Sequence, residues 1–189
     1  MACNLKHLKR SSQSCEENYS GLGTSVYVAF VEDLEAPVEY SDSAAGFNGV
    51  ADFKFKSGKG FYQLDIKKKS GKVTAESNGQ GKGFTNVLTF VINNNMEDMA
   101  LISRAMNNAD TLWMAATGTK NKEGQDGYYA IYDKNFAPEV AISADTGDTP
   151  DSDNGFTVTV TGTPMRYPLP RYYGVLDIEQ ETIPEEGED

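Results

Sequence analysis

The chain of 189 residues has few of the residue types that hold metals or form cross-links. It contains two cysteines, Cys3 and Cys15, and one histidine, His7. All three lie in the polar N-terminal stretch, so we expect no disulfide between the cysteines in the hydrophobic core. A zinc site would also lack its usual set of Cys and His ligands. His7 also has no neighbour that would orient it as a catalytic base. The sequence therefore predicts no metal and no other cofactor.

Long hydrophobic runs are also missing. The longest uninterrupted apolar run covers residues 26–31, whereas a membrane-spanning helix needs about 20 apolar residues. The first ten residues include Lys6, Lys9 and Arg10, but no apolar stretch follows them, so we expect no secretory signal peptide. We expect a protein that is made and kept inside a cell and does not insert into membranes.

Basic residues are in the minority. Lys and Arg number 17 against 28 Asp and Glu, which gives a net charge of −11. Seven of the acidic residues lie in residues 177–189, which contain no basic residue, so the first 176 residues carry 17 basic against 28 − 7 = 21 acidic residues, a net of −4. This excess of acidic residues argues against a protein that binds nucleic acid through its phosphates.

Alternation of apolar and polar residues is the dominant pattern that is present. Phe, Val and Thr alternate most cleanly over residues 156–162, and residues 24–31 are apolar on both faces, as in a strand covered on both sides. Turn signals such as Asn78-Gly79 separate the segments between 47 and 92, which we expect to form a meander. The predicted strands are 24–31, 47–56, 61–68, 72–77, 84–92, 111–117, 127–132, 140–144 and 156–162.

One amphipathic helix is predicted over about residues 96–107. Met99, Ile102 and Met106 form a single apolar stripe at helical spacing, Asn95 is suited to cap the N-terminus, and Arg104 is expected in the last turn. Many strands with one helix predict a mainly β fold: a two-sheet β-sandwich or partly closed barrel with a flanking helix. We expect this domain over 24–165, a polar arm over 1–23, and a Pro/aromatic segment followed by an acidic tail over 166–189.

No group of residues has the pattern of an active site. Asp145 begins an Asp-Thr-Gly triplet of the kind that aspartic proteases use, but the triplet occurs once, so only a homodimer would supply the second carboxylate. The acidic run 145–153 does not fit the EF-hand spacing. Gly79, Gly81 and Gly83 precede a strand rather than a helix, which favours a hairpin over a phosphate-binding loop. We therefore predict that the chain is not an enzyme and keep a dimeric aspartic protease as a remote alternative.

The order of these segments resembles the major tail tube proteins of long-tailed bacteriophages, of the type found in Bacteroides phages and prophages. The residues that carry this resemblance lie in 94–108, 113–117, 127–132 and 153–163. The resemblance implies a homohexameric ring in which sheet edges of neighbouring subunits pair around a channel. Rings would stack into a tube, joined at its ends to other tail proteins, and double-stranded DNA would pass through the lumen without specific binding. The expected location is the virion tail, after assembly in the host cytoplasm.

The resemblance also implies that the long loop 31–46 reaches an adjacent ring. Its acidic residues would meet basic residues of a neighbour and so set the register between rings. The acidic candidates are Glu32, Asp33, Glu35, Glu39 and Asp42. The basic candidates are Lys54, Lys56, Lys67, Lys68 and Lys69.

A virion-associated or surface adhesin that binds carbohydrate is the main alternative. A β-sandwich with ten tyrosines has the residues for such a site if several of them are exposed together. The candidates are Tyr128, Tyr129, Tyr132, Tyr167, Tyr172 and Tyr173. Electron microscopy of the purified protein separates the two hypotheses, because a tube protein gives annuli or filaments and an adhesin gives monomers or trimers.

Overall fold

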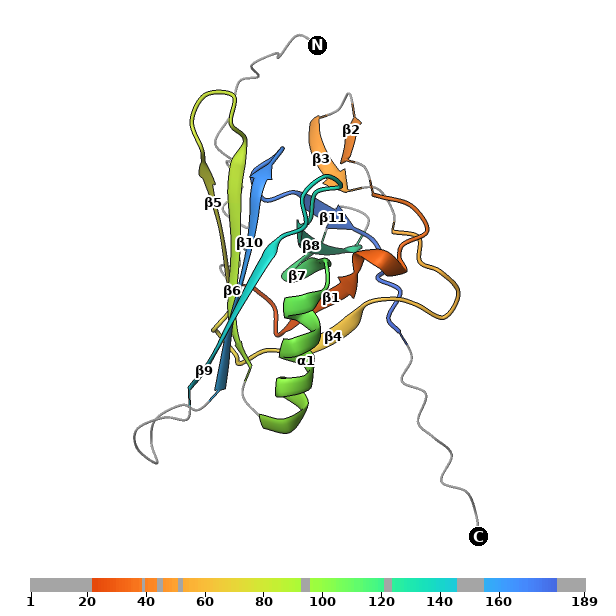
Figure 1. The fold of residues 1–189 in the computed structure, drawn as a ribbon. Helices are drawn as coiled ribbons and strands as arrows, with labels where there is room; N and C mark the ends of the chain where they lie inside the picture. The colour runs from red at the N-terminus through yellow and green to blue at the C-terminus, as the bar shows by residue number, and fades with distance from the viewer. Residues whose placement is uncertain are drawn as a thin grey trace.

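Two antiparallel β-sheets face each other in the computed structural model of the chain, and one helix packs beside them (Figure 1). The structure describes residues 22–38, 40–43, 46–50, 53–92, 96–120, 124–145 and 155–179. The prediction of a mainly β, two-sheet sandwich with one flanking helix is confirmed. Because the two sheets share no strand within these ranges, the partly closed barrel is not confirmed.

The larger sheet has five strands in the spatial order β11-β8-β7-β1-β4. Every neighbouring pair in it is antiparallel. Its strands are β1 (Ser25–Phe30), β4 (Tyr62–Asp65), β7 (Thr111–Lys120), β8 (Asp126–Ile131) and β11 (Arg171–Tyr173).

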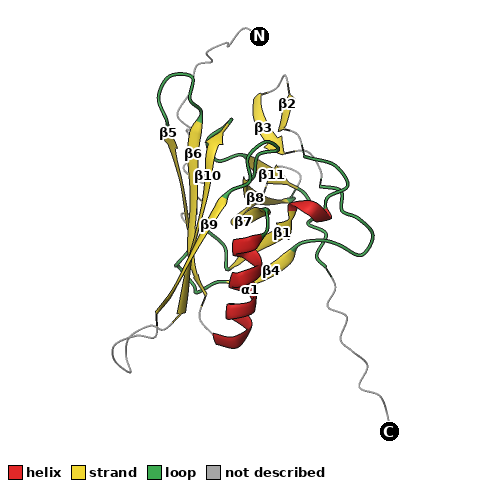
Figure 2. Cartoon of the chain, viewed as in Figure 1, coloured by secondary structure: helices red, strands yellow, loops and turns green. Residues whose placement is uncertain are grey.

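The smaller sheet has four strands in the order β5-β6-β10-β9, again all antiparallel. These strands are β5 (Lys72–Ser77), β6 (Phe84–Ile92), β9 (Glu139–Asp145) and β10 (Gly155–Met165). Figure 2 shows them as a layer of their own, with the helix beside it. The remaining elements are the 3-10 turn η1 (Val31–Asp33), the hairpin of β2 (Tyr40–Ser43) and β3 (Gly46–Val50), and the helix α1 (Met96–Asn108).

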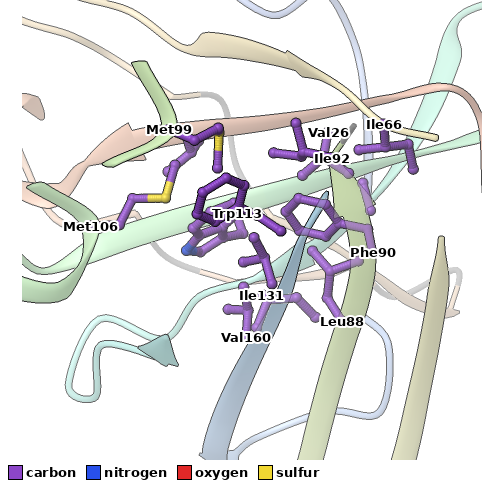
Figure 3. Close-up of a cluster of buried hydrophobic side chains, with 14 residues drawn as sticks. Val26, Ile66, Leu88, Phe90, Ile92, Met99, Met106, Trp113, Ile131 and Val160 are labelled. Carbon is purple, nitrogen blue, oxygen red and sulfur yellow. The ribbon is translucent and has the colours of Figure 1, made fainter. Parts of the chain in front are cut away.

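The first hydrophobic core lies between the two sheets. Trp113 of β7 is fully buried there, and its ring centroid lies 5.8 Å from that of Phe90 of β6. The indole N–H donates a hydrogen bond of 2.9 Å to Thr111 Oγ1, which satisfies the one polar atom of this side chain. Met99 and Met106 of α1 pack beside Trp113 (Figure 3). The predicted apolar stripe of the helix is confirmed, because these side chains close one side of the sandwich.

The second core lies on the other face of the five-stranded sheet. Leu112 and Met114 point to this face, while their neighbours Trp113 and Ala115 point to the first core. Loop residues cover it, with Phe61 at the centre and Phe53 at a ring distance of 5.3 Å. The five-stranded sheet is therefore buried on both faces, which explains why 24–31 has no polar face.

The predicted meander is wrong. Of the four strands predicted between residues 47 and 92, only the last two, β5 and β6, pair with each other, whereas β3 pairs with β2 and β4 pairs with β1. The chain turns at 57–58 and at 68–69, close to the two glycine-containing signals, but it uses these turns to cross from one sheet to another. Strand 47–56 also ends early: β3 stops at Val50, and Phe55 makes only an isolated bridge to Leu34.

The predicted loop 31–46 has regular structure along most of its length. It begins with η1, continues through the bridge at Leu34 and includes β2. In α1, Arg104 lies before the last turn, which holds no basic residue because the helix extends to Asn108. Asn95 lies outside the described residues.

Residues 171–179, which lie beyond the domain predicted over 24–165, pack against it. β11 adds to β8 at the edge of the five-stranded sheet, and Tyr172 and Leu176 are buried in the second core. The backbone of 177–179 then pairs with Phe61: Phe61 N–H donates to Asp177 O at 2.7 Å, and Glu179 N–H donates to Phe61 O at 3.0 Å. Residues 171–179 thus cross one face of the sheet and are part of the domain.

Candidate assembly interface

The outer face of the four-stranded sheet, turned away from the five-stranded sheet, is lined by short side chains with hydroxyl and methyl groups. Burial alternates along β6 and β10, so the half-buried residues identify this face. They are Thr85, Val87, Thr89 and Val91 on β6, and Thr157, Thr159 and Thr161 on β10. The two central strands contain no charged residue, so their outer surface is neutral.

Charges on this outer face lie on the two edge strands. Lys72 and Glu76 belong to β5, and Glu139 and Asp145 belong to β9; all four are exposed. The registers place Lys72 in one row with Thr89, Thr159 and Ala141, and Asp145 lies four residues farther toward the end of the sheet where β5 begins and β9 ends. The first residue of β5 is thus positive, and the last residue of β9 is negative.

The edges of the four-stranded sheet are long. β5 has six residues and β9 has seven, and each pairs with a single strand in the described part of the chain. By contrast, the five-stranded sheet ends in β11 with three residues and β4 with four. Long edges are the part of a sheet that other chains can extend.

The turn that follows β5 shows which of its residues direct their backbone N–H and C=O groups away from β6. Asn78 N–H donates to Gly83 O at 3.0 Å, which continues the β5–β6 ladder with a hydrogen-bonded pair. Hydrogen-bonding direction alternates along an antiparallel strand, so Val73 and Ala75 direct their N–H and C=O groups away from β6. Gly79, Gly81 and Gly83 all have positive φ in this turn, so the hairpin prediction is confirmed.

The acidic segment and two of the predicted basic residues meet within one chain. Glu35 N–H donates to Lys54 O, and Lys56 N–H donates to Asp33 O, both at 2.9 Å. Lys56 Nζ also donates to Glu32 O at 2.6 Å. All three hydrogen bonds use backbone atoms of the acidic segment, so the predicted contact between its carboxylates and lysines of a neighbouring subunit stays a prediction. The contact within the chain was not predicted, because residues about 20 or more apart leave no local signal.

Asp33 has a partner that the sequence analysis did not single out. Lys59 Nζ lies 3.9 Å from Asp33 Oδ1 and 4.0 Å from Glu179 Oε1, so it joins η1 to the C-terminal segment. Asp33 is 9% exposed, whereas Glu32 and Glu35 are exposed. Glu39 lies outside the described residues, and of Asp42 the structure describes only the backbone in β2.

The remaining basic candidates belong to a different part of the molecule. Lys67 N–H donates to Val91 O at 2.7 Å, which places 67–69 beside the four-stranded sheet. Together with Asp145 and Thr157 they border a shallow hollow of about 260 Å³ at one end of the outer face. Lys67–Lys69 therefore border the sheet with the long edges, not the segment that contains Glu32.

The hydroxyls of two half-buried tyrosines, Tyr40 and Tyr62, are in contact with residues from distant parts of the chain. The Tyr40 hydroxyl donates to the carbonyl of Tyr132, and its ring packs edge-on against Tyr167 at 5.5 Å. Burial, reinforced by the nearby Asp133 carboxylate, raises the pKa of Tyr40 well above its ordinary value. Burial and the hydrogen bond to Glu179 raise the pKa of Tyr62 to about 12.

None of the six candidate tyrosines is exposed. Tyr128, Tyr132 and Tyr172 belong to the second core, and the other three are half-buried. Arg171 donates to the hydroxyls of Tyr129 and Tyr173, each at 3.1 Å, and the hydrogen bond to Tyr173 raises the pKa of Arg171. Three of the six rings are thus part of the second core, and the other three are half-buried.

Asp145 is exposed at the end of β9, and the rest of its Asp-Thr-Gly triplet lies outside the described residues. Among the described residues, no three His, Cys, Asp or Glu side chains gather into a possible metal site. The one described helix is too short to span a membrane. Comparison of the chain with protein-family models, curated proteins and solved structures finds no match.

Proposed function

We propose that the chain is a structural subunit that closes into homohexameric rings, and that these rings stack into the tail tube of a long-tailed bacteriophage. The observation that carries the proposal is the pair of long edges, β5 and β9, on a sheet with a neutral outer face. A long unpaired edge promotes uncontrolled aggregation unless a specific partner covers it. Identical subunits are the partner that satisfies both edges at once.

The strand directions support closure into a ring. Four alternating strands leave β5 and β9 running in opposite directions. A rotation about an axis from which the strands tilt by about 35–45°, as in closed barrels, brings β9 of one subunit beside β5 of the next. This new pair is antiparallel, like every pair within the sheet. Such a head-to-tail contact forms a closed ring when the rotation divides a full turn.

The outer face of the sheet suits a channel through which DNA slides. The side chains of β6 and β10 offer no cation to bind phosphates, and the rings of Phe90 and Phe156 lie in the core. Phosphate contacts and base stacking are the two main ways in which proteins hold nucleic acid without reading its sequence. In this proposal the lumen is a largely neutral wall with charges only at the subunit joints.

Negative-stain electron microscopy of the full-length protein tests the proposal. We expect annuli or stacked tubes at high protein concentration. Uniform monomers or trimers would overturn the proposal and favour an adhesin.

A proline in β5 tests whether that edge is used. Ala75→Pro removes an N–H that points away from β6, so the fold tolerates the change while the edge can no longer pair there. We expect Ala75→Pro to abolish rings and the matched control Ala75→Val, which keeps the N–H, to form them. Circular dichroism confirms that both variants fold, and rings in Ala75→Pro would show that this edge is not the joint.

A further inference from the structure

We propose that the subunits join in one specific register: β5 of one chain pairs with β9 of the next so that Lys72 lies opposite Asp145. Thr74 then lies opposite Ser143, and Glu76 opposite Ala141. This inference rests on the proposed ring and adds the contacts that hold it together. It assigns a role in assembly to charged residues that lie exposed on the two edge strands.

Overlap of the two edges favours this register. It pairs all six residues of β5 with residues 140–145 of β9, so the whole shorter strand is hydrogen-bonded. A shift by two residues in one direction leaves Ser77 opposite Pro138, which lies outside β9 and has no N–H to donate. A shift in the other direction leaves Lys72 and Val73 opposite residues beyond the end of β9. Odd shifts are excluded, because they would place core-facing residues such as Val73 beside outer-face residues of the neighbour.

Charge selects the same register. Lys72 opposite Asp145 is a favourable cross-strand pair, and Lys67–Lys69 lie at the same end of the sheet as a second source of positive charge. The shift that places Lys72 opposite Ser143 would place Glu76 directly opposite Glu139. Like charges directly opposite on neighbouring strands are destabilising. Lys72 facing Asp145 favours the proposed register, and Glu76 facing Glu139 disfavours the competing one.

The joint has a geometry that a disulfide can report. Because Val73 and Ala75 direct their backbone groups outward, the pair of Thr74 and Ser143 lies at a non-hydrogen-bonded position, where side chains on opposite strands are closest. Within one chain, β5 and β9 are three strand spacings apart, about 14 Å at about 4.8 Å per spacing. A disulfide between them thus forms only between chains.

The test uses full-length protein in which Cys3→Ser and Cys15→Ser remove the native thiols. We expect Thr74→Cys with Ser143→Cys to give, under mild oxidation, a ladder of covalent oligomers on a non-reducing gel, ending at the ring size seen by microscopy. The matched control, Thr74→Cys with Ala141→Cys, reports the shifted register. It should cross-link at least tenfold more slowly, because its thiols lie on a diagonal in the proposed register. A mixture of the two single-cysteine chains should give only dimers.

The outcomes separate this inference from the proposed function. Faster cross-linking of the 74/141 pair than of the 74/143 pair would overturn the register. Rings without cross-linking of either pair would do the same and leave the ring intact. Absence of rings from the unmodified protein would overturn the proposed function and this inference with it.

A charge exchange gives a second measurement that needs no cysteine. Lys72→Glu places two acidic residues together at the joint, and Asp145→Lys places two lysines there, so each variant should form at least tenfold fewer rings. The double variant restores an opposite pair and should recover most of them. Equal ring yield from all three variants would show that Lys72 and Asp145 do not face each other.

Discussion

The two sheets of this protein differ in what covers them. The five-stranded sheet is buried on both faces and ends in strands of three and four residues, whereas the four-stranded sheet is buried on one face and ends in strands of six and seven. A sheet covered on both faces contributes most to stability, because it removes the most apolar surface from water. The comparison indicates that one sheet stabilises the subunit and the other is available for contact.

The C-terminal segment covers the five-stranded sheet and leaves the four-stranded sheet uncovered. Residues 171–179 pair first with β8 at one edge of the five-stranded sheet and then with Phe61 beside β4 at the other. The same segment therefore covers a face and shields both ends of the sheet. Among the described residues, no comparable segment crosses the outer face of the four-stranded sheet.

Truncation in the second core should have the largest effect. Phe61 is fully buried among Phe53, Phe55 and the C-terminal segment, so we expect Phe61→Ala to lower the free energy of unfolding by about 3–5 kcal/mol. Thr159→Ala, on the outer face, should change it by less than about 0.5 kcal/mol. Denaturation in urea measures both. A similar loss in the two variants would remove the distinction between the sheets.

Adding a methyl group at Gly60, beneath the C-terminal segment, should have the next largest effect on the free energy of unfolding. A Cβ at Gly60 would lie 2.5 Å from Asp177 O and 2.8 Å from Glu179 N. The segment must therefore shift, and we expect Gly60→Ala to cost about 1–3 kcal/mol of unfolding free energy. Ser57→Ala, three residues earlier at an exposed position, is the control and should have little effect. Unchanged stability in Gly60→Ala would show that 177–179 does not hold the five-stranded sheet.

Removal of the Tyr40 hydroxyl should have a smaller, pH-dependent effect. At neutral pH, Tyr40→Phe loses one hydrogen bond to Tyr132 O and about 0.5–1.5 kcal/mol. Because folding raises the pKa of Tyr40, its contribution is fully present below the ordinary tyrosine pKa of 10.0 and is lost as the pH rises toward the folded-state value. Unfolding free energy of the wild type should thus fall above about pH 10.

The fall should be shallower in Tyr40→Phe, although Tyr62, Tyr128 and Tyr132, whose pKa values are also raised, keep part of it. Denaturation curves at several alkaline pH values measure the two slopes. Equal slopes would show that the Tyr40 phenol ionises as easily in the folded protein as in the unfolded chain.

A lysine on the outer face should affect subunit stability least and DNA contact most. Thr159→Lys should change the free energy of unfolding by less than about 0.5 kcal/mol, because the side chain extends into solvent. Assembled rings of this variant should bind double-stranded DNA in a salt-dependent way. Ala100→Lys on α1 adds the same charge at another exposed position and is the control. Equal DNA binding by both variants would contradict a lumen lined by β6 and β10.

Local features of the fold were predictable from the sequence. The strands 72–77 and 84–92 have the predicted bounds, the helix differs by one residue at its end, and the glycine-rich turn 78–83 is a hairpin. Each depends on neighbouring residues: alternation, the spacing of Met99 and Met106, and the positive φ that glycine adopts easily. The role of β11 was missed because three residues among prolines and aromatics carry too short a pattern.

The contacts of the candidate interface were harder to predict from the sequence than the strands. The sequence analysis gave Lys67–Lys69 as candidates for contact with a neighbouring subunit, and they lie beside the four-stranded sheet with the long edges. It also placed Glu32 and Lys56 in two sets of residues expected to meet between subunits. Within one chain, Lys56 Nζ donates to the backbone carbonyl of Glu32, and the contact between subunits stays a prediction. Complementary charge indicates that two segments attract each other and does not tell whether they belong to the same copy.

The sequence by itself determined the mainly β class, the single helix with its buried stripe and the neutral alternation of β6 and β10, because these depend on the order of side chains along one segment. The tertiary structure alone decided which strands share a sheet, which face stays open and which edges stay long. The physical reason is that alternation fixes the face on which a side chain lies but not the strand that lies beside it. Strand partners are chosen by burial of the whole surface, and Phe61, Trp113 and Leu176 contribute to that surface from segments far apart in the chain.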